Sequence, residues 1–106
     1  MEATMSFNVI YPNREGARFD THYYRETHIP LVQRIFHPAR VTLIEGVPMG
    51  GAAPPFVMIA HFEFASLGAL NAALSAPDRG ALRADLANFT DIEPTILLGK
   101  QCSGPK

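Results

Sequence analysis

The order of strand-like and helix-like segments constrains the fold of this chain most. Residues 5–11, 41–47, 56–64 and 95–99 have the alternation or the apolar, β-branched content of β-strands. Helical patterns separate the first strand from the second and the third from the fourth, and a Pro/Gly-rich loop at 48–55 joins the middle pair. This β-α-β-β-α-β order predicts an α+β, ferredoxin-like protomer, with an antiparallel sheet and its helices on one face.

The strand residues expected on the sheet face opposite the helices are more apolar than those of a solvent-exposed surface. In the segment 56–64, Val57 and Ile59 share a face with His61, and the other face is also apolar. An apolar face without helices is most simply covered by a second sheet. We therefore expect a homodimer in which two sheets face each other and enclose a space.

Length and composition indicate one compact domain that covers residues 1–106. Nine basic and ten acidic residues give a net charge of −1, without the basic stripe that a nucleic-acid backbone requires, so we expect no nucleic-acid partner. Apolar runs fall far short of the roughly 18 residues of a membrane span. The N-terminal residues lack a signal-peptide pattern, and the single cysteine, Cys102, fits a reducing compartment. These features predict a cytoplasmic protein.

The segment 19–30 concentrates most of the reactive side chains. Asp20 is a suitable N-cap for a helix, Phe19 before it can pack on Tyr24 one turn later, and Pro30 is expected to stop the helix. The chain then resumes a helical pattern that ends near residue 37.

Tyr24 and His28 are candidate catalytic residues because a spacing of four places them on one helix face. Asp20 lies one turn earlier, so an Asp–Tyr–His column could orient an imidazole whose ordinary pKa of about 6.5 suits proton transfer. In the structural alternative, Tyr24 only packs on Phe19, and His28 bonds carbonyl groups that Pro30 leaves free.

His61 is the third candidate. In the middle of an apolar strand its ring must be hydrogen-bonded to avoid a desolvation cost of about 1–3 kcal/mol. It could act as a second acid or base in the space between two sheets. Alternatively, a pairing with Glu45 or Glu63 would make it a structural contact of the dimer.

Metal and cofactor sites are not expected. His22 and His28 are six residues apart, about 120° from each other around a helix, so they cannot share an ion. The chain lacks the nucleotide-binding glycine patterns and the G-x-S-x-G motif, and it has no tryptophan or basic cluster suited to haem.

Two motifs together resemble the EthD family, a branch of the dimeric α+β barrel superfamily. They are Phe19-Asp20-x-x-Tyr23-Tyr24-x-x-x-His28-x-Pro30 and Asp85-x-x-Asn88-Phe89-Thr90-Asp91-x-x-Pro94. The resemblance implies a ferredoxin-like protomer, a homodimer and a ligand cavity between helices and sheet. It implies no single reaction, because one scaffold hosts many chemistries.

Relatives that isomerise methylmuconolactone use a histidine and a tyrosine of this helix, which Tyr24 and His28 match. They also use a cysteine on the scaffold, and here the only cysteine is Cys102 in the tail, which argues against the same reaction.

The leading hypothesis is an EthD-like protein that binds a small apolar organic molecule and carries out cofactor-independent acid/base chemistry, such as isomerisation, dehydration or oxygenation. His28 would transfer the proton, Tyr24 would orient it or bond a substrate oxygen, and His61 would assist. The alternatives are a non-catalytic protein that binds or delivers a small molecule, and a purely structural role for these side chains.

Overall fold

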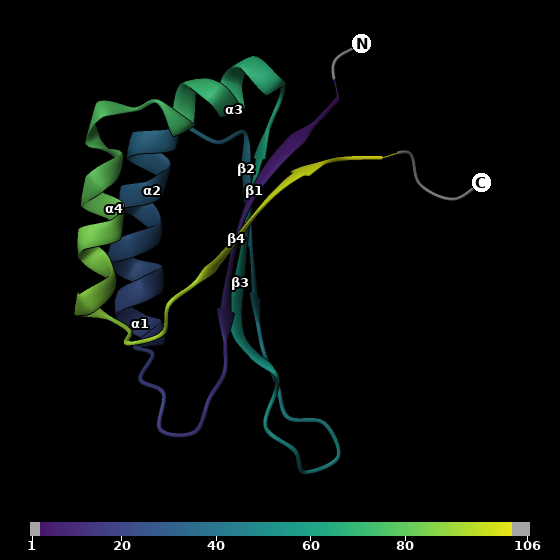
Figure 1. Ribbon diagram of the computed structural model, residues 1–106, viewed down its shortest axis with the longest axis vertical. Helices are drawn as coiled ribbons and strands as arrows, with labels where there is room; N and C mark the ends of the chain where they lie inside the picture. Colours follow the sequence, from purple (N-terminus) through teal and green to yellow (C-terminus); the bar gives the residue numbers. More distant parts are fainter. Residues whose placement is uncertain (1–2, 103–106) are drawn as a thin grey trace.

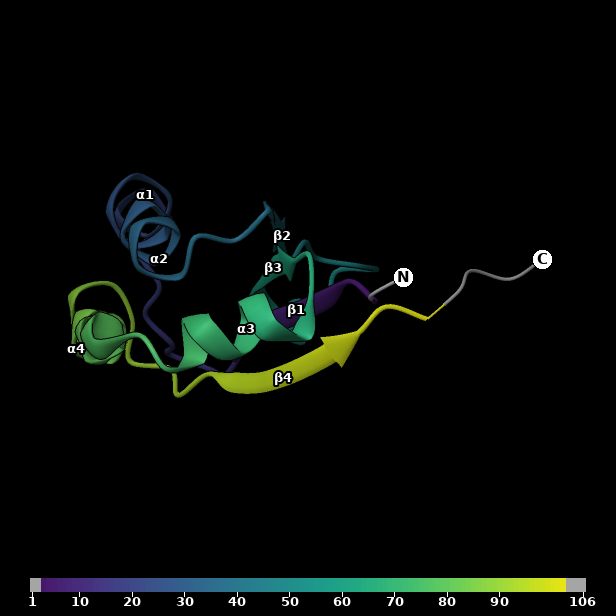
Figure 2. The same ribbon diagram turned by 90° about the horizontal axis from the view of Figure 1, so that it is seen from above.

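The computed structural model describes residues 3–102 and contains one four-stranded antiparallel sheet. The strands are β1 (Met5–Pro12), β2 (Arg40–Glu45), β3 (Phe56–Phe64) and β4 (Thr95–Lys100), in the spatial order β2-β3-β1-β4. The helices lie on one side of the sheet or over its end (Figures 1 and 2). The predicted α+β ferredoxin-like plan is confirmed. The Gly/Pro tail after Cys102, expected from its composition to be frayed, lies outside the described residues.

The first helical layer is one continuous helix with three parts: α1 (Thr21–Tyr23), a π-helical turn η1 (Tyr24–His28) and α2 (Ile29–Phe36). Asp20 caps its start, because its carboxylate accepts the Tyr23 N–H at 3.0 Å. Phe19 packs on Tyr24 with ring centroids 5.0 Å apart, as predicted. The helix ends at His37, whose φ of 51° is left-handed.

The predicted break at Pro30 is wrong, because the helix continues through it. A proline ring normally clashes with the carbonyl group four residues back, which here belongs to Glu26. Glu26 lies in η1, where the Ile29 N–H donates to the Tyr24 carbonyl five residues earlier. This wider turn gives the ring room, so the helix keeps its direction.

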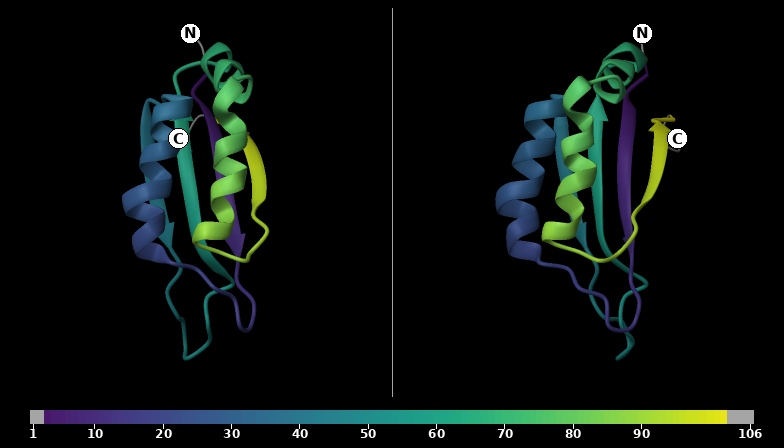
Figure 3. Two further views of the ribbon diagram at one scale, coloured as in Figure 1. Left: turned by 90° about the vertical axis from the view of Figure 1, so that its left-hand side faces the viewer. Right: turned by 60° about the vertical axis from the view of Figure 1, so that its left-hand side comes forward.

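The second helical layer follows β3. It consists of α3 (Leu67–Leu74), capped by Ser66, then a 3₁₀ turn η2 (Pro77–Arg79), α4 (Gly80–Asp85) and a second 3₁₀ turn η3 (Leu86–Asn88). Helices α2 and α4 run side by side over the sheet (Figure 3).

The core lies between these helices and the sheet. Tyr11, Met58, Phe62 and Phe64 project from β1 and β3 toward the helices and are about 1% exposed. Phe89, directly after η3, is completely buried and packs edge-to-face on Tyr11 and Phe19. This single residue ties the end of the second helical layer to the start of the first.

The opposite sheet face carries no helix among residues 3–102 and combines two kinds of side chain. Ile44 and Leu97 are 52% and 56% exposed. Ser6, Asn8 and His61 form a hydrogen-bonded polar row between them. The face is therefore less apolar than the sequence pattern predicts. No helix in the described part of the chain is long and apolar enough to cross a membrane.

The cap at Asp20 can be tested by two substitutions. Asp20→Ala should lower the free energy of unfolding by about 1 kcal/mol, because the Tyr23 N–H loses its acceptor. Asp20→Asn should change it by only a few tenths, since asparagine caps helices equally well. Urea unfolding measures both. Equal losses in the two variants would contradict a capping role.

Candidate functional site

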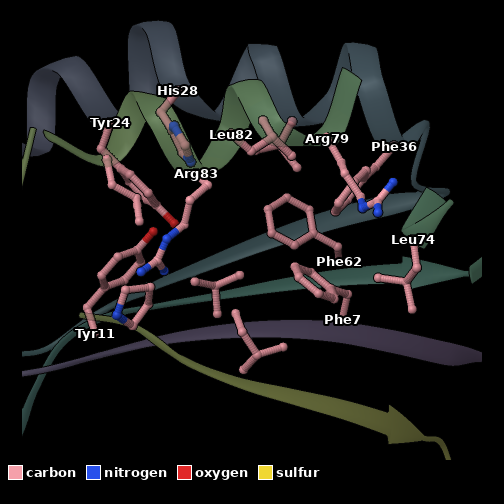
Figure 4. Close-up of a pocket in the computed structure, with 15 residues that line it drawn as sticks. Phe7, Tyr11, Tyr24, His28, Phe36, Phe62, Leu74, Arg79, Leu82 and Arg83 are labelled. Atoms are coloured by element: carbon pink, nitrogen blue, oxygen red, sulfur yellow. The ribbon is translucent and has the colours of Figure 1, made fainter. Parts of the chain in front are cut away.

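A cavity of about 280 Å³ lies between the helical layers and the sheet (Figure 4). Most of its wall is apolar, and its polar side chains are phenols, an imidazole and guanidinium groups. The lining residues are Phe7, Val9, Tyr11, Tyr24, His28, Val32, Phe36, Phe62, Leu74, Arg79, Leu82, Arg83, Leu86, Pro94 and Ile96. An engineered cavity of about 150 Å³ holds benzene, so this space suits an organic molecule about twice that size.

His28 is held in the cavity wall by Asp85 of the second helical layer. The distance from His28 Nδ1 to Asp85 Oδ2 is 2.8 Å, and the two side chains are only 6% and 11% exposed. The π-helical turn carries His28, and α4 ends at Asp85, so the contact joins the two helical layers. Phe89 packs against the imidazole at 4.6 Å between ring centroids.

Asp85 remains ionised because several donors surround it. Although burial raises the pKa of this carboxyl, hydrogen bonds from Tyr23, Asn88 and His28 together hold it below its usual value. Tyr23 donates its hydroxyl to Oδ1 at 2.6 Å, and the Asn88 amide donates to the same atom at 2.9 Å. The pKa of Tyr23 is raised, first by this bond to Asp85.

The charge on Asp85 fixes the proton of neutral His28 on Nδ1, because a carboxylate only accepts hydrogen bonds. Nε2 then carries the lone pair. Among residues 3–102, no buried side-chain nitrogen or oxygen lacks a partner, and Nε2 has no protein partner there, so solvent or a ligand reaches it. Burial lowers the pKa of His28 and the Asp85 carboxylate partly offsets this effect, which favours the neutral ring at pH 7.

Tyr24 stacks on His28 with ring centroids 5.6 Å apart and an interplanar angle of 17°. Its hydroxyl interacts with that of Tyr11, and the two phenols lie at the same end of the cavity (Figure 4). Burial raises the pKa of both residues far above the usual range. Both phenols therefore stay protonated and act as hydrogen-bond donors.

The structure brings Tyr24 and His28 together, as their spacing predicts. The predicted contribution of Asp20 is wrong, because Asp20 caps the helix and Asp85 orients the imidazole. His61 lies on the opposite sheet face, where its Nδ1 contacts Asn8 Oδ1 at 2.6 Å and its Nε2 lies 3.6 Å from Glu63. His61 therefore does not join this cavity. Its contact with Glu63 lies within one protomer, so its two expected roles between facing sheets, as an acid or base or as a dimer contact, stay predictions.

Sequence reasoning missed the roles of Asp85, Tyr23 and Asn88. Asp85 is the first residue of the second motif, and Asn88 follows three residues later. This spacing places the two side chains on the same face of a helix, within reach of each other. That spacing was the available signal for the pair. The contact of Asp85 with His28 depends on how α4 packs against the first helix, which the sequence pattern does not specify.

The described part of the chain contains no group of three or more histidine, cysteine, aspartate or glutamate side chains placed to hold a metal ion.

Comparison with known proteins gives consistent results. Residues 16–93 match the EthD domain. The crystal structure of an EthD-like protein from Ralstonia eutropha JMP134 is similar, with 33% identity, a TM-score of 0.83, and coverage of 93% of this chain and 92% of that chain. No curated protein matches the chain.

Two more distant structures support the fold alone. An EthD family protein from Bacillus halodurans C-125 is 17% identical, with a TM-score of 0.73 over 93% of this chain and 99% of that chain. A dimeric protein of unknown function with a ferredoxin-like fold, from Bacteroides fragilis NCTC 9343, is 11% identical, with a TM-score of 0.52 over 92% and 96%. The domain match and the 33% identity over most of the chain show that this protein belongs to the EthD family.

Proposed function

We propose that this protein binds a small, largely apolar organic molecule in the 280 Å³ cavity and moves a proton on it with His28. The observation that carries the proposal is the 2.8 Å contact between His28 Nδ1 and Asp85, which leaves Nε2 of a neutral imidazole as a base at the cavity wall. An Asp–His pair of this kind fixes the tautomer and stabilises the imidazolium that forms.

The simplest reaction is proton removal from a carbon next to a carbonyl group. Nε2 takes the proton, the C–H bond breaks, and its electron pair moves through the new C=C bond to the carbonyl oxygen. The Tyr24 hydroxyl, kept protonated by burial, donates a hydrogen bond to that oxygen as its negative charge develops. Return of the proton to another atom would complete an isomerisation. The same first step can precede dehydration, if a hydroxyl on the next carbon leaves as water, or oxygenation, if dioxygen is the co-reactant and oxidant.

A non-catalytic binding protein remains the alternative function. The apolar wall formed by residues such as Phe7, Phe62 and Leu82 supports binding without turnover. The two functions differ in what His28 contributes, since a carrier needs shape and apolar surface but no base.

Deuterium exchange distinguishes proton transfer from binding without turnover. A panel of apolar aryl ketones in D₂O, followed by ¹H NMR, should lose C–H signal faster with the protein, and His28→Gln should slow this exchange by about 10²–10⁴-fold. Ketone affinity should stay within a few-fold, because the apolar wall is intact.

His22→Gln is the matched control, since His22 is exposed on the same helix and does not line the cavity. His61→Gln should also leave the rate unchanged, given its place on the far face. If the ketones bind but His28→Gln exchanges them as fast as the wild type, the protein is a carrier. If His28→Gln does not fold and the wild type binds none of the ketones, the result would support a purely structural role for His28.

The protonation state of His28 gives a second test. Burial lowers its pKa and Asp85 raises it, so Asp85→Asn should move the titration midpoint further below 6.5. The exchange rate should fall on the acid side of that midpoint. The unfolded chain binds this proton more readily, so the free energy of unfolding should also decrease as the pH drops below about 6.5.

NMR titration of the imidazole signals measures the midpoint, with His28→Gln to assign the resonance. Asp78→Asn removes an equivalent charge that does not contact His28 and should not shift it. An upward shift in Asp85→Asn would contradict the assigned contact.

We also infer a homodimer formed through the sheet face without helices. Leu97 and Ile44 are about half exposed there, and they flank a polar row whose hydrogen bonds are satisfied within the protomer. Apolar side chains on a sheet face are a common basis for a second sheet to pack on.

Leu97→Lys should convert the dimer to a monomer, because burying an unpaired ammonium in the interface is costly. Leu67→Lys is the control, since Leu67 is 54% exposed on α3, away from this face. Sedimentation velocity measures both variants. A wild-type monomer at high concentration, or a Leu97→Lys dimer, would contradict the interface.

A further inference from the structure

The cavity has an uneven distribution of charge. Two arginines, Arg79 and Arg83, line it, and none of the fifteen lining residues is acidic. Asp78, next to Arg79 in the chain, lines a different hollow beside Arg34 and Leu31. The formal charges that line the cavity are therefore positive, and the nearest carboxylates, Asp85 and Glu93, contact His28 and Arg83 without lining the cavity themselves.

The two arginines differ in what already binds them. Arg83 makes a two-point contact with Glu93, at 2.6 and 2.8 Å, which neutralises its charge. Arg79 donates from Nη1 to the Ala76 carbonyl oxygen at 3.1 Å, a neutral acceptor, and no ion pair to Arg79 is found among residues 3–102. Its guanidinium thus has donors available for a charged partner.

Arg79 lies at the opposite end of the cavity from the reactive groups. In Figure 4 it stands beside Phe36 and Leu74, whereas Tyr11, Tyr24 and His28 cluster at the other end. His28 and Phe36 are eight residues apart along the same helix, which corresponds to about 12 Å. Phe7, Phe62 and Leu82 lie between the two polar ends.

We propose that the ligand is an elongated apolar molecule with a carboxylate at one end, which Arg79 binds, while its reacting carbon lies near His28 at the other end. This inference rests on the proposed function and names its substrate class. A guanidinium matches the two oxygens of a carboxylate, and the apolar middle of the cavity fits an aromatic or aliphatic body. Anchoring the remote end also places the reacting carbon at a fixed distance from the base.

The test uses a matched pair of probes, 5-oxo-5-phenylpentanoate and its methyl ester. Both have an exchangeable C–H next to a ketone, and only the acid carries the remote charge. Isothermal titration calorimetry should show the acid binding about 10- to 100-fold more tightly than the ester. Arg79→Gln should remove this difference by lowering the affinity for the acid, with the affinity for the ester unchanged.

Arg25→Gln is the control, because Arg25 is an exposed charge on the first helix that does not line the cavity. It should preserve the preference for the acid. Added salt should lower the affinity of the wild type for the acid more than its affinity for the ester. Circular dichroism confirms that the variants are folded.

Equal affinity for acid and ester, an unchanged preference in Arg79→Gln, or no binding of either probe would overturn this inference. The proposed function is judged separately, by the His28-dependent exchange of neutral ketones. A positive ketone result with no preference for the acid would reject the anionic substrate class and leave the proton-transfer role in place.

Discussion

A buried carboxylate has to be hydrogen-bonded or give up its charge, and Asp85 meets this requirement with three donors from two separate helical layers. Tyr23 and His28 come from the first helix, and Asn88 comes from the turn after α4. Removing the carboxylate would leave the buried Nδ1–H of His28 without an acceptor, at a cost of about 1–3 kcal/mol, whereas half-buried Tyr23 and exposed Asn88 could turn to water. The same contact therefore fixes how the helices pack and which nitrogen of His28 faces the cavity.

The local features of the fold could be predicted from sequence because they depend on neighbours in the chain. The cap at Asp20, the packing of Phe19 on Tyr24 and the alternation of β3 follow directly from spacing. The error at Pro30 has a different origin. A proline is incompatible with a regular α-helix, but a single π turn removes the clash, and a proline within a helical pattern is compatible with either a break or such a turn.

The site could be predicted only in part, for a related reason. Tyr24 and His28 lie on one helix, so their proximity is encoded by a four-residue interval. The partner of the imidazole lies 57 residues away in sequence. Asp20 was the acidic residue that helical spacing places on the same face, two turns before His28, but its carboxylate is used by the helix terminus, where a free backbone N–H competes for it. Contacts of this length are set by tertiary packing.

The surroundings of each polar group in and behind the cavity wall favour one protonation state of that group. Burial keeps the phenols of Tyr11 and Tyr24 neutral and also favours neutral His28, while hydrogen bonds keep Asp85 charged. The proposed reaction would therefore find its hydrogen-bond donors, its base and its orienting carboxylate in the protonation states that it requires near pH 7. The phenols and His28 lie at one end of the cavity and Arg79 at the other, so the two ends of the cavity differ in chemistry. A site that only stored apolar molecules would need no such polarity.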